Sequence, residues 1–403
     1  MVVQAAPGTI VTIAGTGEPG FAGDGGPALE AYLNEPKSLT VDDAGHLFIA
    51  DSENHVIRRV DLKSGLITTV AGRADGTFSR EPESGGPERG SRSAAEEDLL
   101  EDSTATTSKP FAQLADLSGT VRFVAGSAPR GGRFHGDGGP AREATFNFPT
   151  AVAVDEDGHL YVADTMNHRV RKVDAKTGLI TTIAGTGQHR WSGDGGPAVA
   201  AALNEPSALV VDHKGRLYIA DQSNHRVRKV DLATGIITTV AGTGDAGYTG
   251  DGGPAVEAGL AGPSGLALGP DSALYIADTF NGRIRRVDPV SRAISTVAGD
   301  GGEYRYQGRP HEFSTSLSRP YGIAMEREGH LLITDSDSHL IRRWDCRKKI
   351  VIALAGNGLA QFAGDGGSAQ ACSLNYPFGV AIDLRGNVYI ADTFNHRIRC
   401  IAA

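Results

Sequence analysis

The sequence predicts an all-β fold in which six four-stranded sheets close into a ring, a β-propeller. Composition is the first reason: 54 glycines and only 6% aromatic residues favour many short strands joined by tight turns. The second reason is a repeat of the type "HLYVADTMNHRVRKVD". Its strand-ending aspartate recurs, with the last four steps 57 residues each, at Asp51, Asp164, Asp221, Asp278, Asp335 and Asp392.

Each repeat contains four short strand patterns, which are clearest in the second copy. They are "AVAVD" (151–155), "LYVAD" (160–164), "HRVRKVD" (168–174) and "LITTIAG" (179–185). β-Branched residues alternate with others, and Asp or Gly turns bound each run. A four-stranded meander cannot bury both of its faces alone, whereas radial packing of several copies does so.

The two ends of the chain predict how the ring closes. The last repeat stops at "RIRCIAA" without a fourth strand, and "TIVTIAG" (9–15) is a fourth strand without its first three. We therefore expect the N-terminal strand to complete the last blade. Asp51 and Asp164 lie about two periods apart, which indicates a degenerate unit between them. We favour six full blades with an irregular acidic insertion at about 79–109 over a seventh, eroded blade. Residues 1–403 are then one propeller domain.

Charge and cysteine content exclude several classes of protein. The net charge is −9 without a basic stretch, which argues against nucleic acid as a partner. Cys346, Cys372 and Cys400 form no CxxC pair, so they are expected to be small buried hydrophobes. With neither a transmembrane run nor a leader in the given sequence, we expect a cytoplasmic monomer that does not bind membranes, or a secreted or periplasmic one if a leader was removed.

The repeat resembles the NHL family, named for an Asn-His-Leu signature. That signature stands here as Asn54-His55, Asn167-His168, Asn224-His225, Asn395-His396 and, more weakly, Ser338-His339, while the fourth repeat has Asn281-Gly282. In repeat style the chain is similar to bacterial NHL-repeat proteins and to the NHL domain of teneurins. The resemblance implies a six-bladed propeller but no single activity, because propellers carry unrelated functions.

Two family activities are not implied by these residues. RNA-binding NHL domains of the TRIM type use a basic face, which this acidic chain lacks. A peptide-amidating lyase of related fold holds zinc on histidines just after the proline that opens the first strand of a blade. The matching positions contain no histidine: they are Lys37, Thr150, Ser207, Ser264, Tyr321 and Phe378.

The glycine-rich "GDGGPA" connector occurs repeatedly, with its acidic residue at Asp24, Asp137, Asp194, Asp251 and Asp365. We expect a structural loop in which the aspartate bonds the following turn and the aromatic residue three positions earlier covers a gap between blades. A calcium site is the less favoured alternative, because each loop offers a single carboxylate and carboxylates spread round a ring converge weakly on one ion. No cofactor is otherwise expected. The corner histidines are predicted to be structural, and the arginine pairs of the third strands, such as Arg285-Arg286, to be solvated or to pair between blades.

Function is expected where the repeats differ from one another. The candidate ligand-binding residues lie in two irregular connectors and at the tunnel mouth: His189, Arg190 and Trp191; Tyr304, Tyr306, Arg309 and His311; and Lys37, Tyr321 and Phe378. The sequence favours a non-enzymatic module that docks a protein, peptide or glycan on this loop face. The alternative is a hydrolase or lyase that acts on a small molecule at the tunnel mouth, with or without a metal, although no known catalytic motif supports it.

Overall fold

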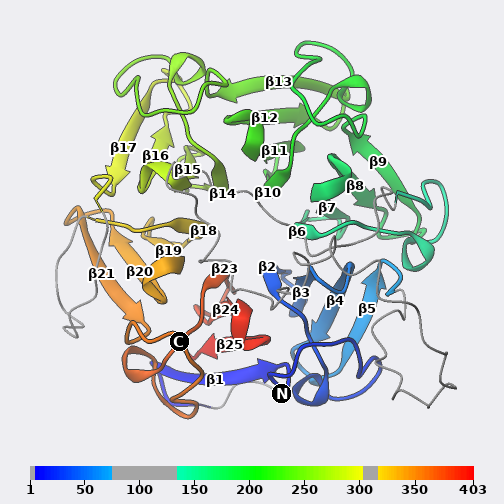
Figure 1. The fold of residues 1–403 in the computed structure, drawn as a ribbon, viewed down its shortest axis with the longest axis vertical. Coiled ribbons are helices and arrows are strands. Elements are labelled where there is room, and N and C mark those ends of the chain that lie inside the picture. Colours follow the sequence, from blue (N-terminus) through cyan, green and yellow to red (C-terminus); the bar gives the residue numbers. More distant parts are fainter. Residues whose placement is uncertain (1–4, 75–133, 303–315) are drawn as a thin grey trace, which may run out of the picture. The chain divides into compact units, whose positions relative to one another are not determined.

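The computed structural model describes residues 5–74, 134–302 and 316–403, which form a ring of six antiparallel sheets (Figure 1). The prediction of six blades is therefore confirmed. The predicted insertion at 79–109 and the following segment to residue 126 lie outside the described residues.

Each blade is a meander whose strands pair in sequence order from the ring's centre outward. Blade 1 comprises β2 (Pro36–Val41), β3 (His46–Asp51), β4 (Val56–Asp61) and β5 (Ile67–Ala71). Blade 2 comprises β6 (Pro149–Val154), β7 (Leu160–Asp164), β8 (Arg169–Val173) and β9 (Ile180–Ala184). Blade 3 comprises β10 (Pro206–Val211), β11 (Arg216–Asp221), β12 (Arg226–Asp231) and β13 (Ile236–Ala241).

Blade 4 comprises β14 (Pro263–Leu268), β15 (Leu274–Asp278), β16 (Arg283–Val287) and β17 (Ile294–Ala298). Blade 5 comprises β18 (Pro320–Met325), β19 (Leu331–Asp335), β20 (Leu340–Asp345) and β21 (Ile350–Ala355). Blade 6 comprises β23 (Pro377–Ile382), β24 (Val388–Asp392), β25 (Arg397–Ile401) and β1 (Thr9–Ala14), with the two-residue β22 (Gly367–Ser368) outside β1.

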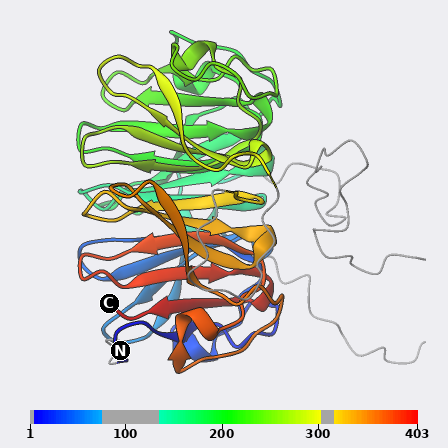
Figure 2. The same ribbon diagram turned by 90° about the vertical axis from the view of Figure 1, so that its left-hand side faces the viewer.

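Single-turn 3-10 helices occupy two recurrent places. The connectors that enter the blades contain η1 (Ala28–Glu30), η3 (Ala141–Glu143), η5 (Ala198–Ala200), η7 (Ala255–Glu257) and η10 (Ala369–Ala371). The corners after the second strands contain η4 (Thr165–Asn167), η6 (Gln222–Asn224), η8 (Thr279–Asn281), η9 (Ser336–Ser338) and η11 (Thr393–Asn395). In Figure 2 the strands run from one face of the ring to the other. In a four-stranded meander, the corner between the second and third strands and the connector that leads to the next blade lie at the same end, so the connectors and corners share one face.

The hydrophobic core lies between successive blades. Second strands such as β7 are buried at every position, because a neighbouring blade covers each face of the sheet. Phe48 of blade 1, for example, packs in one cluster with Val152 and Val162 of blade 2. Outer strands such as β5 instead alternate between buried and half-buried residues. The short apolar runs of the sequence therefore become strands that are covered on two sides.

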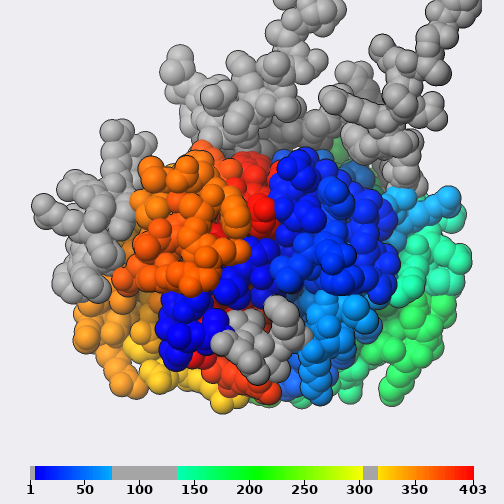
Figure 3. All heavy atoms as spheres, turned by 90° about the horizontal axis from the view of Figure 1, so that it is seen from below, coloured from blue at the N-terminus to red at the C-terminus, as the bar shows by residue number. Residues whose placement is uncertain are grey.

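The N-terminal strand closes the ring, as predicted. β1 pairs antiparallel with β25, with Ile10 opposite Ile401 and Val11 opposite Cys400. Figure 3 shows the blue N-terminal residues beside the orange and red C-terminal ones. The last blade is thus assembled from both ends of the chain, which holds the circle shut without a covalent link.

The glycine-rich connectors cover the outer edges of the blades. In blade 1 the Gly25 N–H donates to the Ile67 carbonyl (2.8 Å), and the Ile67 N–H donates to the Gly26 carbonyl (3.0 Å). The Thr69 N–H donates to Asp24 Oδ2 at 3.0 Å. The structural role expected for the loop is confirmed, but the expected partner of the aspartate was wrong: it bonds the outermost strand rather than its own turn. Covering an edge in this way prevents it from pairing with another chain.

The first arginine of each third-strand pair is buried, so the prediction that these arginines are solvated was wrong. Each guanidinium is fully buried at Arg58, Arg171, Arg228, Arg285, Arg342 and Arg399. Arg228 pairs with Asp194 of the connector at 2.6 Å and with Asp221 of β11 at 3.4 Å. It thereby ties the connector, the second strand and the third strand of one blade together. The second residue of a pair can face solvent, as Arg286 does while it pairs with Asp271 at 2.6 Å.

Candidate functional site at the tunnel mouth

The tunnel mouth is formed by the six residues that follow the opening proline of each innermost strand. They are Lys37, Thr150, Ser207, Ser264, Tyr321 and Phe378, on β2, β6, β10, β14, β18 and β23. Figure 1 shows these six strands nearest the axis of the ring. The residues divide into two halves, because blades 5, 6 and 1 present long side chains whereas blades 2, 3 and 4 present short hydroxyls.

Lys37 lies among aromatic rings from two neighbouring blades. Its Nζ is 4.9 Å from the centroid of Phe378, 5.6 Å from that of Phe394 and 5.3 Å from that of Phe148. It also pairs with Glu35 at 2.8 Å, and only 7% of the residue is exposed. Aromatic faces attract a cation, so this ring of phenylalanines fixes the lysine beside its carboxylate.

Tyr321 extends the aromatic half. Its ring meets that of Phe378 edge-on, with centroids 4.5 Å apart, and Tyr376 packs against Phe394 at 5.2 Å. The Tyr321 hydroxyl is buried without a hydrogen-bond partner among the described residues, and burial raises its pKa above the ordinary value. The three tunnel-mouth residues singled out from the sequence are therefore brought into one cluster, whose half-buried edge is Tyr376 and Phe394.

The hydroxyl half follows a regular pattern with one exception. Thr165 Oγ1 donates to the Pro206 carbonyl of the next blade at 2.8 Å and lies 2.6 Å from Thr150 Oγ1. In blade 3 the corresponding corner residue is Gln222, and Ser207 Oγ instead donates to the Pro263 carbonyl at 3.2 Å. Both polar atoms of the buried Gln222 amide lack partners among the described residues. The Gln222 amide is therefore, after the Tyr321 hydroxyl, a second buried polar group of the site without a partner among the described residues.

The residue after each of these six positions sets how closely neighbouring innermost strands approach. Glycine follows Ser264, Tyr321 and Phe378, and a methyl group added to Gly265 or Gly322 would collide with the carbonyl oxygen of Tyr321 or Phe378 on the next blade. Ser38, Ala151 and Ala208 occupy the same position in the other blades. The innermost strands of blades 4, 5 and 6 therefore approach one another too closely for a side chain at this position.

Glu53 is a carboxyl of this site with a strongly shifted pKa. Burial and the nearby Glu35 carboxylate raise the pKa and Lys37 lowers it, and together they bring it to about 7. A carboxyl that titrates near neutral pH can accept or donate a proton under physiological conditions.

The corner histidines join successive blades. His168 Nδ1 accepts a hydrogen bond from the Glu205 N–H at 3.2 Å, and His55 Nδ1 accepts one from the Phe148 N–H at 3.0 Å. The same bond joins His225 to Gly262, His339 to Tyr376 and His396 to Glu35. Each histidine has a left-handed backbone, with φ of 52° at His168, and Gly282 takes that conformation in blade 4. The expected structural role of these histidines is confirmed.

Acidification should weaken these hydrogen bonds between blades, and the pH dependence of stability at His168 tests this prediction. Burial, His189 and Arg169 lower its pKa to about 4. Because the folded pKa lies below the unfolded value, the stability that neutral His168 contributes is present above about pH 6.5 and is lost as the pH falls toward 4. Between pH 7.5 and pH 5, we expect the free energy of unfolding of wild type to fall by about 1 kcal/mol more than that of His168→Asn, after allowing for solvent screening.

Urea unfolding at the two pH values measures this difference. Asparagine tolerates the left-handed backbone, so the variant should fold. His213→Asn is the control, since His213 is exposed in a turn of blade 3. Equal pH dependence of wild type and His168→Asn would contradict the prediction.

His189, Arg190 and Trp191 lie on the connector between β9 and β10. The Trp191 ring packs beneath the Arg226 guanidinium, 4.3 Å away, and is 45% exposed. His189 lies near His168 at a ring separation of 5.7 Å, and the Arg190 carbonyl accepts a bond from the Asn224 amide. Trp191 is one of several exposed aromatic rings on connectors, together with Phe21, Tyr248 and Phe362. Tyr304, Tyr306, Arg309 and His311 lie outside the described residues.

Sequence reasoning missed Phe148, Phe394, Glu35 and Glu53. Phe148 and Glu35 immediately precede an opening proline and have φ of 55° and 48°. Two other non-glycine residues share this position and this conformation, Glu205 and Tyr376. The repeat alignment shows that this position varies among Glu, Phe, Gly, Arg and Tyr, and that variation was the available signal.

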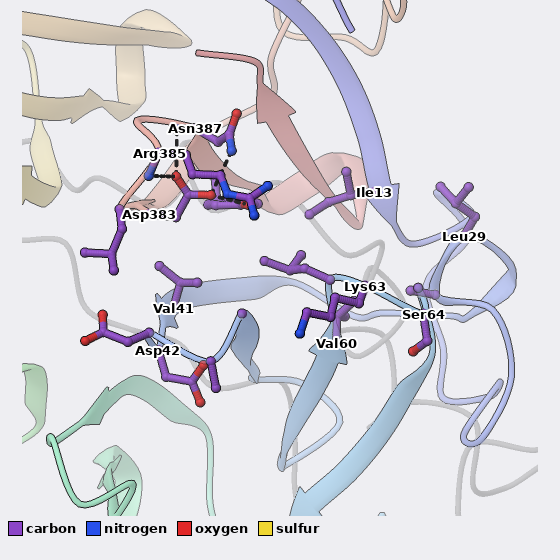
Figure 4. Close-up of a pocket in the computed structure, with 18 of the residues that line it drawn as sticks. Ile13, Leu29, Val41, Asp42, Val60, Lys63, Ser64, Asp383, Arg385 and Asn387 are labelled. Atoms are coloured by element: carbon purple, nitrogen blue, oxygen red, sulfur yellow. Dashed lines mark hydrogen bonds between the residues drawn. The ribbon is translucent and has the colours of Figure 1, made fainter. Parts of the chain in front are cut away.

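A cavity of about 420 Å³ opens at the opposite end of the blades, between blades 6 and 1 (Figure 4). Ile13, Val41 and Val60 form its apolar wall, and Lys63 and Arg385 lie on facing sides. Asp383 and Asp42 also line it, but Asp383 already accepts bonds from Asn387 and Tyr389, and Asp42 from His46. This cavity was not predictable from local sequence patterns, because its walls come from the two ends of the chain.

Among the described residues, no three His, Cys, Asp or Glu side chains are grouped to hold a metal ion. Within the same residues, no helix has the length and apolarity needed to cross a membrane.

Family models match this chain at its repeats. The NHL repeat model matches residues 146–173 and 374–401, and the teneurin NHL domain model matches residues 10–87 and 186–249. The chain carries NHL repeats. The resemblance inferred from the Asn-His corners and the glycine-rich connectors is thus confirmed.

The relatives of this NHL propeller are larger proteins. Protein SUPPRESSOR OF QUENCHING 1, chloroplastic, of Arabidopsis thaliana is 31% identical over 65% of this chain and 26% of its own length. NHL repeat-containing protein 2 of Gallus gallus is 30% identical over 64% of this chain and 39% of its own length. Teneurin-1 of Mus musculus is 31% identical over 68% of this chain and 9% of its own length. The chain thus spans well under half of each of these relatives.

Solved structures support the fold alone. An auxiliary nutrient binding protein from Bacteroides ovatus matches 99% of this NHL propeller and 77% of that chain with a TM-score of 0.60 and 14% identity. A protein of unknown function from Bacteroides thetaiotaomicron matches 97% of this chain and 74% of that one with a TM-score of 0.60 and 17% identity.

Proposed function

We propose that this propeller is a binding module that holds a polypeptide partner over the tunnel mouth. The observation that carries the proposal is the inequality of six equivalent positions: Lys37, Tyr321 and Phe378 on one side, and three short hydroxyl residues on the other. A scaffold needs only equivalent blades, whereas an unequal ring can orient an unsymmetric ligand.

The chemistry of the two halves suits a polypeptide. The half-buried Tyr376 and Phe394 offer aromatic surface, which is enriched at the centres of protein interfaces. The Tyr321 hydroxyl and the Gln222 amide are buried polar groups with unused bonding capacity among the described residues, and unpaired buried groups favour a partner that satisfies them. Protein interaction is also a common role of NHL propellers.

Selection from a displayed random-peptide library, followed by fluorescence anisotropy on the selected peptides, tests this function. We expect Lys37→Met and Phe394→Leu each to lower the affinity for the selected peptides about tenfold, which corresponds to about 1.4 kcal/mol of binding free energy. Leu384→Ala is the matched control, because Leu384 is 54% exposed at the opposite end of the blades. Circular dichroism verifies that each variant remains folded.

Peptides whose affinity is unchanged by both variants would refute a tunnel-mouth site. Failure of the library combined with binding of oligosaccharides that Phe394→Leu abolishes would assign the mouth to glycans instead. The alternative of a hydrolase or lyase stays a hypothesis, and Glu53→Gln is the variant that would remove its candidate acid or base.

A further inference from the structure

The cavity between blades 6 and 1 lies at the end of the blades away from the tunnel mouth, and the residues that line it belong to the described part of the chain (Figure 4). Its volume of about 420 Å³ is in the range of pockets that hold small organic molecules. Ile13, Val41 and Val60 form its apolar wall, and the buried Tyr389 also lines it. An apolar wall offers little to water and favours an apolar ligand.

The gap between blades 4 and 5 contains a tryptophan at the place where the gap between blades 6 and 1 is hollow. Trp344 of β20 and Val60 of β4 are counterparts, because each stands two residues after the buried arginine of its strand. Tyr275 and Tyr389 are counterparts too, since each stands three residues before the aspartate that ends its second strand. The buried Trp344 ring packs against Tyr275, with ring centroids 6.2 Å apart. An indole ring therefore fits in this fold at the place that lies open beside Tyr389.

A lysine covers the indole of blade 5, and a glycine takes its place in blade 1. Lys349 Nζ lies 5.0 Å from the centroid of the Trp344 ring. Gly65 follows Val60 at the same interval as Lys349 follows Trp344. The two residues share a left-handed backbone, with φ of 74° at Gly65 and 58° at Lys349, so the turn is alike and only the covering side chain differs. Smaller residues at both positions leave blade 1 with space that blade 5 fills.

The polar groups at the rim of the cavity suit an aromatic ring better than a charged ligand. Asp42 already accepts the His46 N–H at 2.8 Å, and Asp383 accepts the Tyr389 hydroxyl at 3.0 Å. The exposed Arg385 also lines the cavity, and its guanidinium makes no hydrogen bond or ion pair with any described residue. A guanidinium is attracted to the face of an aromatic ring, as the Lys349 ammonium is in blade 5.

We propose that the cavity between blades 6 and 1 is a binding site for a planar aromatic small molecule about the size of indole. The ring takes the place that the Trp344 side chain has in blade 5, beside Tyr389 and against Val60, and the Arg385 guanidinium packs on it from the rim. This site is at the other end of the blades from the tunnel mouth, and it does not depend on the function proposed there.

Fluorine NMR titration of 5-fluoroindole with the full chain tests the proposal. We expect saturable one-to-one binding with a Kd on the order of 0.1–1 mM, which is the affinity that so small a molecule can reach. Val60→Trp should lower the affinity at least about tenfold, because the new indole fills the cavity as Trp344 fills its gap. Val60→Trp combined with Gly65→Lys copies blade 5 more fully and should abolish the binding. Circular dichroism verifies that each variant is folded.

A second variant keeps the core intact. Arg385 is exposed, so Arg385→Ala should fold, and we expect it to lower the affinity for 5-fluoroindole about threefold by removing the cation that packs on the ring. Lys214→Ala is the matched control. Lys214 is exposed at the same place in blade 3, where its N–H bonds Asp212 as the Arg385 N–H bonds Asp383. This control should leave the affinity unchanged.

Three results would overturn the proposal. The first is the absence of saturable binding of 5-fluoroindole to wild type at millimolar concentration. The second is an affinity that neither a folded Val60→Trp nor Arg385→Ala lowers; if Val60→Trp does not fold, equal affinities of Arg385→Ala and Lys214→Ala decide against the proposal. The third is a tryptophan-containing hexapeptide that binds more than about tenfold tighter than 5-fluoroindole and is lost in the same variants, which would assign the cavity to a side chain of a partner polypeptide.

Discussion

Removal of residues 1–15 is expected to abolish the cooperative unfolding of the ring. Those residues include β1, in which Ile10 is fully buried in a cluster with Leu332 and Ile341 of blade 5. On its other side Ile13 packs with Leu39 and Leu47 of blade 1. The truncation removes these two isoleucine side chains and all the backbone hydrogen bonds between β1 and β25. The resulting loss in the free energy of unfolding is comparable with a protein's whole net stability of about 5–15 kcal/mol. Thermal and urea unfolding followed by circular dichroism measure the effect.

A circular permutant provides the control for chain length. Ala402 already bonds the start of β1, because its N–H donates to the Thr9 carbonyl at 3.0 Å and its carbonyl accepts from the Gly8 N–H at 2.9 Å. Residues 6–15 placed after Ala403 through a two-residue linker would therefore form a β25–β1 hairpin like those between the third and fourth strands of other blades. The permutant should recover most of the stability. A truncated chain that unfolds with the wild-type midpoint would contradict the idea that β1 closes the ring.

Local repetition explains how far the sequence predicted this fold. Strand positions, blade number and the closing strand followed from a repeat whose apolar residues alternate and whose last copy is incomplete. The strand positions and the blade number depend on pairing between neighbours in sequence, which a repeat displays directly, whereas the closing strand was predicted from the missing fourth strand of the last copy. The order of β23, β24, β25 and β1 was predictable because "TIVTIAG" has no other place in a four-stranded unit.

Long-range contacts explain what the sequence did not predict. The partner of Asp194 is Arg228, 34 residues later, and nothing in either local pattern links them. The arginine pairs looked like an exposed face because two adjacent cations are seldom buried, yet β-strand alternation separates them: Arg285 is buried while Arg286 faces outward. The tunnel-mouth residues were predictable as departures from the repeat, but the rings around Lys37 come from the blades on either side.

The buried Arg228 should be the most sensitive single side chain of blade 3. Arg228→Met removes the cation from between Asp194 and Asp221 and leaves Asp221, which is fully buried, without its guanidinium. We expect a loss of about 3–5 kcal/mol in the free energy of unfolding, since breaking a buried pair leaves an uncompensated charge. Urea unfolding measures it, and Lys229→Met, the adjacent outward residue of β12, is the control.

The loss should also depend on pH in a defined direction. Burial raises the pKa of Asp221 to about 6, while the Asn204 N–H, the Asn224 amide and Arg228 hold it down. Without Arg228 the folded pKa rises further above the unfolded value, so the destabilisation is relieved below the unfolded pKa and grows as the pH rises through the folded pKa. The deficit of Arg228→Met should therefore be smaller at pH 5 than at pH 8.

A triple variant separates charge from packing. Arg228→Met combined with Asp194→Asn and Asp221→Asn removes all three charges, and replacing a complete buried ion group by neutral side chains is often close to neutral in stability. We expect it to recover most of what Arg228→Met loses and to lack the added pH dependence. If the triple variant were as unstable as the single one at both pH values, the role of Arg228 would be to fill space between the connector and β11 rather than to neutralise Asp221.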